Sequence, residues 1–210
     1  MSKNSSFSYA GAGTTQFTNL LLPAIVDFAE DLTPAPRILD VGCGHGFIAG
    51  YFLSKGCKVV GIDLHAESIA IARKHYPNGR FEVLGADQHI LANLAEEPFD
   101  LVISTEVVEH LYDPRSYATG CFTSLRSGGR FICTTPFHGY LRNLALALCN
   151  KFDFYANPLW DGRHIKLWRR KTLSQLLTET GFENLRFRGV GRVPYLWMSM
   201  IMCGDKPMVR

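Results

Sequence analysis

The chain has 210 residues, of which 47% are hydrophobic and 20% are charged. This length suits one globular domain with a full core, and this composition excludes disorder, collagen and coiled-coil repeats. The formal net charge of +3 is too small to demand a polyanionic partner, so charge alone does not identify a substrate. The 6 cysteines form no Cys-x-x-Cys pair, which favours reduced thiols and a cytoplasmic location. Residues 1–13 do not resemble a signal peptide, and no apolar run approaches the roughly 18 residues of a membrane-spanning helix.

The first part of the chain predicts a flexible N-terminus and a leading helix, together residues 1–36, that would act as a lid. The helix is expected over residues 18–30, and the proline-containing stretch 33–36 ends it. Short apolar runs then alternate with helical segments, which predicts βαβ units on a parallel sheet. The expected strands are residues 37–41, 58–62, 80–84, 99–105 and 128–135, and the first two expected helices between them are residues 47–55 and 67–75. A further helix begins at Asp113 and Pro114, because aspartate is a good N-cap and proline suits the first turn.

The last third of the chain departs from this alternation. Residues 141–149 predict a short apolar helix, and the segment from there to residue 168 mixes aromatic and basic side chains, which indicates an insertion above the sheet. Thr172 and Gln175 have the spacing of a capping box, and Gly181 ends the helix that follows. The runs 183–190 and 195–203 predict a closing hairpin. The sequence therefore predicts a single α/β domain with a seven-stranded, mostly parallel sheet and a C-terminal antiparallel hairpin.

A glycine-rich loop, residues 40–46 (DVGCGHG), joins the first expected strand to its helix. Glycines at alternate positions let the backbone turn tightly and approach a ligand closely. Asp63 follows the second strand, where a carboxylate can bind a ribose diol, and Asp87 follows the third, near the expected place of an adenine amino group. The longer Gly-x-Gly-x-x-Gly spacing of dinucleotide oxidoreductases is absent, and Asp40 would repel a pyrophosphate but attract a cation. The plain alternative is that these residues only form turns.

The segments ILDVGCGHG, GIDL and GAD resemble the S-adenosylmethionine-binding signature of class I methyltransferases. The resemblance covers most of the chain. It implies a Rossmann-like class I methyltransferase fold over residues 37–210, with a substrate-side insertion at about residues 137–168. It also implies that the glycine loop surrounds the methionine end of S-adenosylmethionine, that Asp63 binds the ribose and that Asp87 lies at the adenine. The donor-binding residues that it implies are Asp40, Gly42, Cys43, Gly44, Gly46, Asp63, Leu64, Asp87, Gln88 and Thr105.

Acidic and imidazole side chains gather after the fourth strand, where doubly wound sheets bind ligands. Glu106, Glu109 and His110 lie there, and His164 follows in the insertion. Two neighbouring carboxylates repel one another unless one takes up a proton or a cation lies beside them. Two glutamates and two imidazoles suit Mn²⁺, Fe²⁺, Co²⁺ or Zn²⁺ better than Mg²⁺. The sequence therefore predicts a divalent-metal site formed by Glu106, Glu109, His110 and His164.

The order of EVVEH, the Thr135-Pro136 turn, an apolar helix and HIKLWRRKTLSQLLTETGF resembles the ubiquinone-pathway O-methyltransferases. It is also similar in part to small-RNA 3′-terminal 2′-O-methyltransferases, in which a Glu-x-x-Glu-His motif and a later histidine hold a metal. Residues 135–161 differ from both families, so the acceptor does not carry over. The resemblance implies O-methylation of a small-molecule hydroxyl, assisted by Mg²⁺, Mn²⁺ or Zn²⁺, with Glu106, His110 and His164 as catalytic residues.

Three alternatives remain open at this stage. His110 could act as a general base without a metal, since its ordinary pKa is close to neutrality. The two glutamates could instead pair with basic neighbours while His164 packs among tryptophans and Leu167. The chain could also bind the donor without turning it over.

The insertion combines aromatic and basic side chains, which suits an aromatic, glycan or lipid-linked acceptor. A nucleic-acid acceptor is disfavoured but left open, and the oligomeric state is not predicted. The apolar helix is more typical of a core or a dimer interface, although a peripheral membrane contact remains an alternative. The residues concerned are the aromatic Phe152, Phe154, Tyr155, Trp160 and Trp168 and the basic Arg142, Lys151, Arg163, Lys166, Arg169 and Arg170.

Overall fold

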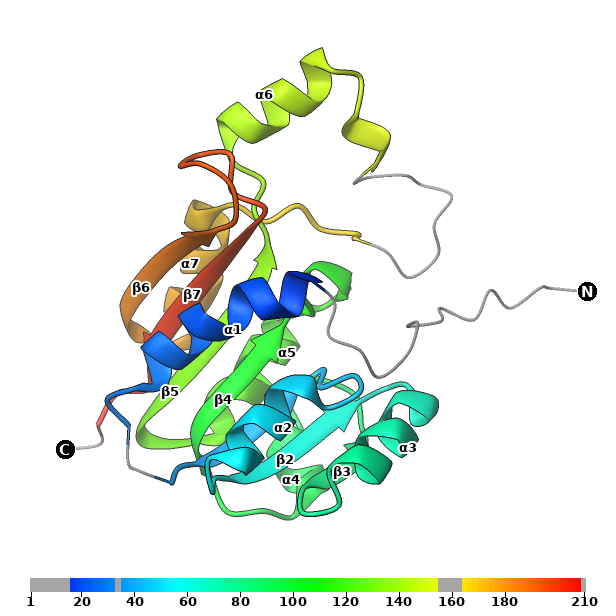
Figure 1. Cartoon of the computed structure of the whole chain (residues 1–210). Helices are drawn as coiled ribbons and strands as arrows, with labels where there is room; N and C mark the ends of the chain where they lie inside the picture. The colour runs from blue at the N-terminus through cyan, green and yellow to red at the C-terminus, as the bar shows by residue number, and fades with distance from the viewer. Residues whose placement is uncertain (1–15, 33–34, 155–163, 209–210) are drawn as a thin grey trace, which may run out of the picture.

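The computed structural model describes residues 16–32, 35–154 and 164–208 of the chain. Its centre is one seven-stranded sheet (Figure 1). The strands are β1 Arg37–Val41, β2 Lys58–Asp63, β3 Arg80–Val83, β4 Phe99–Thr105, β5 Leu125–Pro136, β6 Glu183–Val190 and β7 Ser199–Asp205. Their order is β3-β2-β1-β4-β5-β7-β6. β1 to β5 pair in parallel, and β7 is antiparallel to both β5 and β6, so the predicted sheet and closing hairpin are confirmed.

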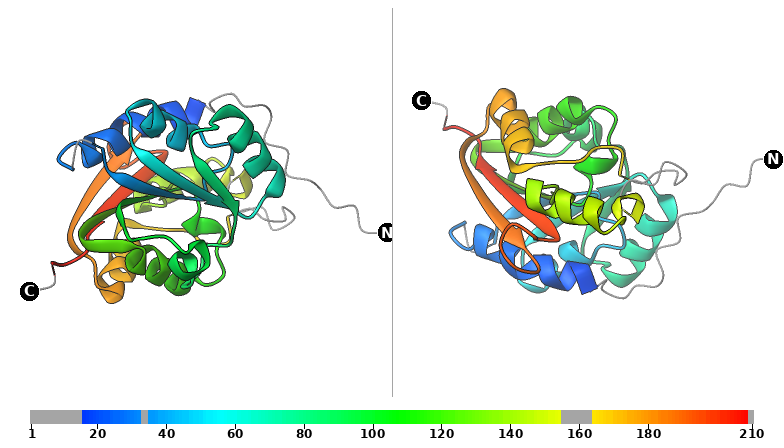
Figure 2. Two further views of the ribbon diagram at one scale, coloured as in Figure 1. Left: turned by 90° about the horizontal axis from the view of Figure 1, so that it is seen from below. Right: turned by 90° about the horizontal axis from the view of Figure 1, so that it is seen from above.

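Helices cover both faces of this sheet, as Figure 2 shows from two directions. One face carries α1 Gln16–Ala29, α2 Phe47–Ser54 and α3 Ala66–His75, and the other carries α4 Ile90–Leu94, α5 Pro114–Thr123 and α7 Arg170–Thr180. The remaining helical segments are the 3₁₀ turns η1 Val108–His110 and η2 Phe152–Phe154 and the helix α6 Tyr140–Leu148. Within the described ranges, no helix combines the length and the hydropathy that crossing a bilayer would require.

The core forms because side chains of a strand alternate between the two faces of the sheet. Ile38 and Leu39 are neighbours in β1, and both are fully buried, one under each helical layer. On one side, Leu21 and Ile25 of α1 are also fully buried. Parallel strands covered on both faces read as continuous apolar runs in the sequence. For this reason the sequence predicts each of the parallel strands.

Two local predictions need correction. Thr172 and Gln175 do not form the expected capping box, because α7 already begins at Arg170 and the Thr172 hydroxyl accepts a hydrogen bond from the Arg169 amide. Gln175 instead donates to Glu179, while Gly181 ends the helix in a left-handed conformation as predicted. The last strand begins at Ser199 rather than at residue 195, because the preceding residues belong to the turn of the hairpin. The predicted lid falls partly on residues 1–15 and 33–34, which lie outside the described residues.

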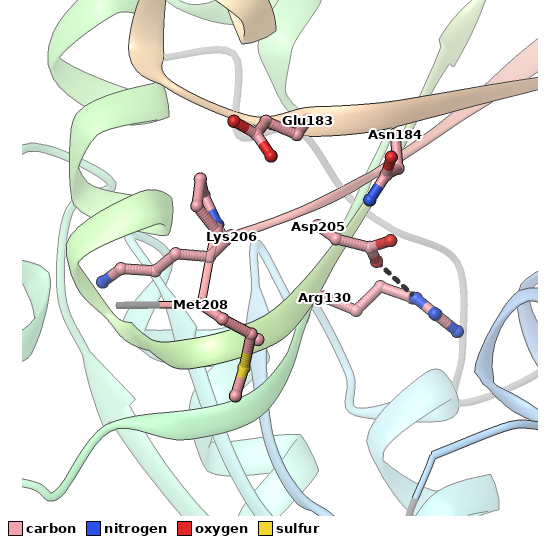
Figure 3. A pocket seen from close by; sticks show the side chains of 8 residues that line it. Arg130, Glu183, Asn184, Asp205, Lys206 and Met208 are labelled. Atoms are coloured by element: carbon pink, nitrogen blue, oxygen red, sulfur yellow. Dashed lines mark hydrogen bonds and ion pairs between the residues drawn. The ribbon is translucent and has the colours of Figure 1, made fainter. Parts of the chain in front are cut away.

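A hollow of about 730 Å³ lies at the amino-terminal edge of the parallel strands, next to the start of β6 (Figure 3). Arg130 and Lys206 are its basic side chains, yet both are already engaged. Arg130 donates to Asp205 at 2.8 Å, and Lys206 donates to the carbonyls of Phe122 and Leu125 at the end of α5. This hollow is therefore part of the stabilising framework, and the candidate site residues that the sequence singles out lie at the opposite edge.

Candidate active site

The carboxyl ends of β1 and β4 lie side by side in the middle of the sheet. From β1 the chain proceeds outward to β2 and β3, whereas β4 and β5 lie on the other side of β1. Loops leaving β1 and β4 therefore diverge to opposite faces, and open α/β sheets bind their ligands in the crevice that this reversal creates. Residues that the sequence singles out lie after β1, β2, β3 and β4, so all of them converge on this edge.

The glycine loop follows β1 and is fixed by two hydrogen bonds to β2. The amides of Gly42 and Cys43 both donate to the carbonyl of Ile62, at 2.8 and 2.9 Å. Gly42 has a φ of +74°, and a Cβ there would overlap the side chain of Val107. Gly44 has a φ of +52° and faces open space, with no atom within 4 Å of the position that a Cβ would take. The loop thus offers an open cradle of backbone at the point where a ligand would approach.

Asp40 is the buried acid of this loop. It is 2% exposed, and within the described residues its Oδ2 atom has no hydrogen-bond partner. Burial raises the pKa of Asp40 from 3.8 to about 7, with a smaller contribution from the charge of Asp63. Burial likewise raises the pKa of the Cys43 thiol, so this cysteine is a packing residue rather than a nucleophile. An unpaired buried carboxylate favours a cationic ligand beside it.

Asp63 ends β2 and faces the glycine loop. Its Oδ2 accepts a hydrogen bond from the Gly44 amide at 2.9 Å. Its Oδ1 accepts from the amide of His65 at 2.8 Å and contacts Nδ1 of the same histidine at 3.0 Å. Leu64, between them, is 67% exposed. A carboxylate held in this way at a strand end can accept hydrogen bonds from a diol, as the sequence predicts.

The loop after β3 carries Asp87 and is held against α5. The Asp87 carboxylate accepts from the His89 amide at 2.7 Å, and the Gln88 amide donates to Ser116 Oγ at 3.0 Å. A Cβ at Gly120, one turn further along α5, would overlap the carbonyl oxygen of Asp87. Sequence analysis missed Ser116 and Gly120. The only signal in the sequence was that these are two small residues one helical turn apart, which lets another segment approach the helix closely.

The end of β4 places two polar side chains inside the crevice. Thr105 has a buried Oγ1 atom with no hydrogen-bond partner among the described residues. Glu106 has a φ of +56°, a left-handed conformation that is uncommon for a residue with a Cβ. Its Oε1 accepts hydrogen bonds from Thr134 Oγ1 at 2.8 Å and Ser199 Oγ at 2.9 Å. Sequence analysis missed Thr134 and Ser199, because they reach Glu106 only through the pairing of β4, β5 and β7.

The structure brings Glu109, His110 and His164 together. Nε2 of His110 lies 3.8 Å from Oε1 of Glu109, and Nε2 of His164 lies 3.9 Å from the same oxygen. One ligand atom from each of the three residues can be chosen so that all lie within 4.8 Å of one another. Glu109 is buried, and both imidazoles are partly exposed. A carboxylate and two imidazoles are a donor set for a divalent transition metal.

Backbone hydrogen bonds place His164 in this cluster. The carbonyl of Glu109 accepts from the amides of both Ile165 and Lys166, at 3.0 and 3.1 Å. The carbonyl of Val108, the residue before Glu109, accepts from the indole N–H of Trp168 at 3.1 Å. Trp168 is buried and therefore anchors the end of the insertion to η1.

Glu106 is not part of the three-residue cluster, although it lies beside it. Burial raises the pKa of Glu106 while the hydroxyl donors lower it, and burial together with the neighbouring Glu106 raises the pKa of Glu109 further. Thr135 Oγ1 donates to Glu109 at 3.0 Å. The structure thus contains the adjacent carboxyl pair that the sequence predicts, with Glu106 turned toward β5 and β7.

The insertion places α6 beyond the strand ends, standing away from the body of the molecule (Figure 1). Of the two places that the sequence favoured, the core and a dimer interface, the structure excludes the core, because Tyr140, Leu141, Leu144 and Leu148 are between 41% and 79% exposed. Arg142 is the buried residue of this helix and donates to the carbonyl of Phe137. Tyr155, Trp160 and Arg163 lie outside the described residues.

An aromatic cluster that sequence analysis missed lies at the top of the hairpin. Phe137, Phe187 and Trp197 pack with ring centroids 5.2 to 6.4 Å apart, and the Arg170 guanidinium lies 4.8 Å from the Phe187 centroid. Because these residues come from β5, β6 and the β6–β7 turn, only the sheet pairing brings them together.

Comparison with known proteins places the chain among methyltransferases. The model of a methyltransferase domain family matches residues 15–186. A ubiquinone biosynthesis O-methyltransferase of Cereibacter sphaeroides is 37% identical over 195 residues, which cover 85% of this chain and 75% of that protein. Its counterpart in Dinoroseobacter shibae is 32% identical over 176 residues, covering 78% and 68%.

Solved structures show the same fold at lower identity. A SAM-dependent methyltransferase from Methanosarcina mazei superposes with a TM-score of 0.66 at 21% identity, covering 89% of this chain and 98% of that one. A phosphoethanolamine N-methyltransferase of Haemonchus contortus, in complex with S-adenosyl-L-methionine, gives a TM-score of 0.67 at 16% identity, covering 90% and 53%.

Proposed function

Since the chain belongs to the methyltransferase domain family and is an S-adenosylmethionine-dependent methyltransferase, we propose that it methylates a hydroxyl oxygen of a small molecule. The observation that carries this proposal is the cluster of Glu109, His110 and His164 beside the donor crevice. The names of the relatives from Cereibacter sphaeroides and Dinoroseobacter shibae support an oxygen acceptor.

The residues of the crevice fit the donor. The open backbone at Gly44 leaves room for the methionine end, and the unpaired Oδ2 of Asp40 supplies the negative charge that a sulfonium or an ammonium group favours. Asp63 binds the ribose hydroxyls, and the loop at Asp87 and Gln88 borders the adenine. When bound, S-adenosylmethionine supplies an electrophilic methyl group. Gly42, Cys43, Gly46 and Leu64 shape the loops around it, and Thr105 Oγ1 offers a hydrogen bond inside the crevice.

The metal part of the proposal assigns Glu109, His110 and His164 as ligands. The set fits a divalent ion because it brings one buried carboxyl and two imidazoles within 4.8 Å of one another. A divalent ion held there would supply Lewis acidity that lowers the pKa of an acceptor hydroxyl. Glu106 remains the fourth candidate ligand. In the structure, hydrogen bonds from Thr134 and Ser199 hold its carboxyl toward β5 and β7.

The side chains of this cluster have defined tasks toward the acceptor. With a metal bound, His110 and His164 would hold it beside the acceptor hydroxyl. Without a metal, a neutral imidazole of His110 would accept the hydroxyl proton instead. Glu109, held by Thr135, orients the histidines from the buried side. Orientation of the oxygen toward the methyl group contributes much of the acceleration, because the transfer itself needs no covalent intermediate with the protein.

The experiment is a methyl-transfer assay with labelled S-adenosylmethionine against catechol, glycan, lipid-linked and RNA acceptors, with and without a chelator. Methylation of a small-molecule hydroxyl that excess chelator abolishes, and that Mn²⁺ or Zn²⁺ restores, is the expected result. Full activity in excess chelator would exclude the metal and leave His110 as the base. Transfer only to nitrogen or carbon would contradict the proposal, and donor binding without transfer to any acceptor class would favour a binding protein.

We further propose that α6 makes a peripheral contact with an anionic membrane surface, which would bring a lipid-linked acceptor to the crevice. Leu141, Leu144 and Leu148 are spaced along one side of α6 and are exposed. Lys151 lies three residues after the helix, and its amide donates to the Leu146 carbonyl. Apolar side chains followed by an exposed cation match a bilayer with anionic head groups.

A further inference from the structure

His65 occupies the N-cap position of α3 but does not cap it. Its side chain makes no hydrogen bond to the first turn of the helix. Serine, threonine, aspartate and asparagine are the residues that satisfy the free amides of a helix start, and histidine is a poor substitute. The ring instead points back along the chain, where Nδ1 lies 3.0 Å from Oδ1 of Asp63. Because an ionised carboxylate only accepts hydrogen bonds, Nδ1 must carry the proton in this contact.

The Asp63 carboxylate receives three donors in the ligand-free chain. Oδ2 accepts from the Gly44 amide at 2.9 Å, and Oδ1 accepts from the His65 amide at 2.8 Å as well as from the ring. A carboxylate has about four lone-pair positions. A ribose that binds through two vicinal hydroxyls needs two of these positions. Together with the three groups already bound, that would make five hydrogen-bond donors for four lone-pair positions.

One of the three groups that now donate hydrogen bonds to Asp63 must therefore leave when a ribose binds. The Gly44 amide is fixed by the glycine loop, and the His65 amide is fixed by the turn from β2 into α3. The imidazole is attached through rotatable bonds, and the side chain of His65 is 62% exposed, so it has space to turn outward. We propose that the ring of His65 competes with the ribose of S-adenosylmethionine for Asp63 and is displaced when S-adenosylmethionine binds.

This inference rests on the proposed assignment of Asp63 to the ribose. In this account, the ring of His65 holds the Asp63 carboxylate in place when S-adenosylmethionine is not bound. The same contact lowers the affinity for S-adenosylmethionine. The consequence is specific to the ring, because the backbone amide of residue 65 remains in any variant. Removing the ring should therefore tighten donor binding, whereas loss of an ordinary structural contact would weaken it.

The test is isothermal titration of S-adenosylhomocysteine into the full chain and its variants. His65→Ser removes the ring and adds a side chain that caps α3, so the fold is preserved. His65→Ala removes the ring without adding a cap. Both variants should bind about three- to tenfold more tightly, the factor expected for releasing one competing hydrogen bond. His75→Ser is the matched control, because this exposed histidine lies at the other end of α3, where its ring contacts the carbonyl of Ile71. Its affinity should be unchanged.

Equal or weaker binding by His65→Ser and His65→Ala would overturn the inference. A further variant, Asp63→Asn, keeps this outcome distinct from failure of the proposed function. If Asp63→Asn binds as well as the natural chain, the ribose assignment is wrong and the inference fails with it. If the natural chain does not bind S-adenosylhomocysteine at all, the proposed donor site itself is contradicted. Displacement would also be supported directly if the ring nitrogen resonance of His65 shifts when S-adenosylhomocysteine is added while that of His75 does not.

Discussion

Asp40 shows how a single residue in this crevice trades stability for ligand binding. Its carboxyl is buried and one oxygen has no hydrogen-bond partner in the described structure. The pKa of Asp40 is raised by burial from 3.8 to about 7, so its ionised form is disfavoured in the folded chain. An acid whose pKa is raised on folding destabilises the fold above its ordinary pKa, and the loss is complete above about pH 7. On the proposed assignment, the positive charge of S-adenosylmethionine beside Asp40 would offset this loss.

Asp40→Asn should therefore move affinity and stability in opposite directions. The variant loses the negative charge, so its affinity for S-adenosylmethionine should fall by about tenfold or more. Its free energy of unfolding at pH 8 should rise, by up to about 4 kcal/mol from the shift in the pKa of Asp40. Calorimetry and denaturant unfolding measure the two effects. Weaker binding together with a less stable fold would contradict this account.

The same residue predicts how donor binding depends on pH. Only the ionised form of Asp40 attracts the cation, so affinity for S-adenosylmethionine should increase from pH 6 to about pH 7 and level off above it. Asp40→Asn provides the control, because its affinity should vary much less over this range. An equal dependence in both proteins would assign the titration to another group.

His164 is the residue that tests the metal cluster. His164→Ala removes one of the two imidazoles beside Glu109, so affinity for Mn²⁺ should fall by at least about tenfold and turnover with it. Donor affinity should stay the same, since the glycine loop is untouched. His75→Ala, which changes an exposed histidine on α3, should alter neither quantity. If Mn²⁺ titration followed by electron paramagnetic resonance showed equal affinity in all three proteins, the cluster would not be a metal site.

At the level of single residues, the sequence indicated the acids but not their partners. Asp40, Asp63 and Asp87 could be recognised because each lies at or shortly after the end of an apolar strand. Thr134 and Ser199 could not, since they meet Glu106 only through strand register. The core position expected as one alternative for α6 was wrong, because a helix rich in leucine and alanine is usually covered by the same chain.

Among the elements, α5 links the two halves of the site. It follows η1, which carries Glu109 and His110, and its N-cap Asp113 accepts hydrogen bonds from the amides of Arg115 and Ser116. Ser116 in turn accepts from the Gln88 amide. The start of α5 therefore connects η1, which carries Glu109 and His110, with the loop that carries Asp87 and Gln88.

Gly120→Ala tests this link. Alanine is intrinsically better than glycine within a helix, by about 1 kcal/mol. At this position, however, its Cβ would overlap the Asp87 carbonyl and push the adenine loop outward. Donor affinity should fall by about tenfold while the helix content is kept, as calorimetry and circular dichroism would show. Thr119→Ala, an exposed neighbour on the same helix, should bind the donor normally. An unchanged affinity of Gly120→Ala would mean that the loop does not contact the donor.

Element boundaries were predictable wherever apolar periodicity and turn residues agreed. β1 and β4 were placed correctly to the residue, and Asp113 with Pro114 started α5 as expected. The start of α7 was missed, because Thr172 and Gln175 mimic a capping box although the helix begins one turn earlier. Tertiary contacts decide such a case, since several positions can satisfy the free amides of a helix start.

The whole molecule separates stability from function along the sheet. Ion pairs gather at the amino ends of the strands, where Glu96 pairs with both Arg37 and Arg80 and Asp100 pairs with Arg126. At the opposite edge lie the buried carboxyls of Asp40, Glu106 and Glu109, whose pKa values are raised by burial. Buried charge without such ion pairs costs stability, which is expected of a functional site.

The position of α6 at this edge gives a prediction for the molecule as a whole. The double variant Leu144→Glu and Leu148→Glu should lose co-sedimentation with vesicles of anionic lipid, because it places charge on the exposed apolar side. Methylation of a water-soluble acceptor should persist. Met208→Glu is the control, since Met208 is 71% exposed but lies at the opposite edge of the sheet. If the natural chain does not bind such vesicles, α6 has another role.

A crystal structure of the chain with S-adenosylhomocysteine tests the central claim most directly. We predict ribose hydroxyls on Asp63, the amino-acid end over Gly44 beside Asp40, and the sulfur directed toward Glu109 and the two histidines. A ligand seated elsewhere, or one whose sulfur faces away from that cluster, would contradict the account.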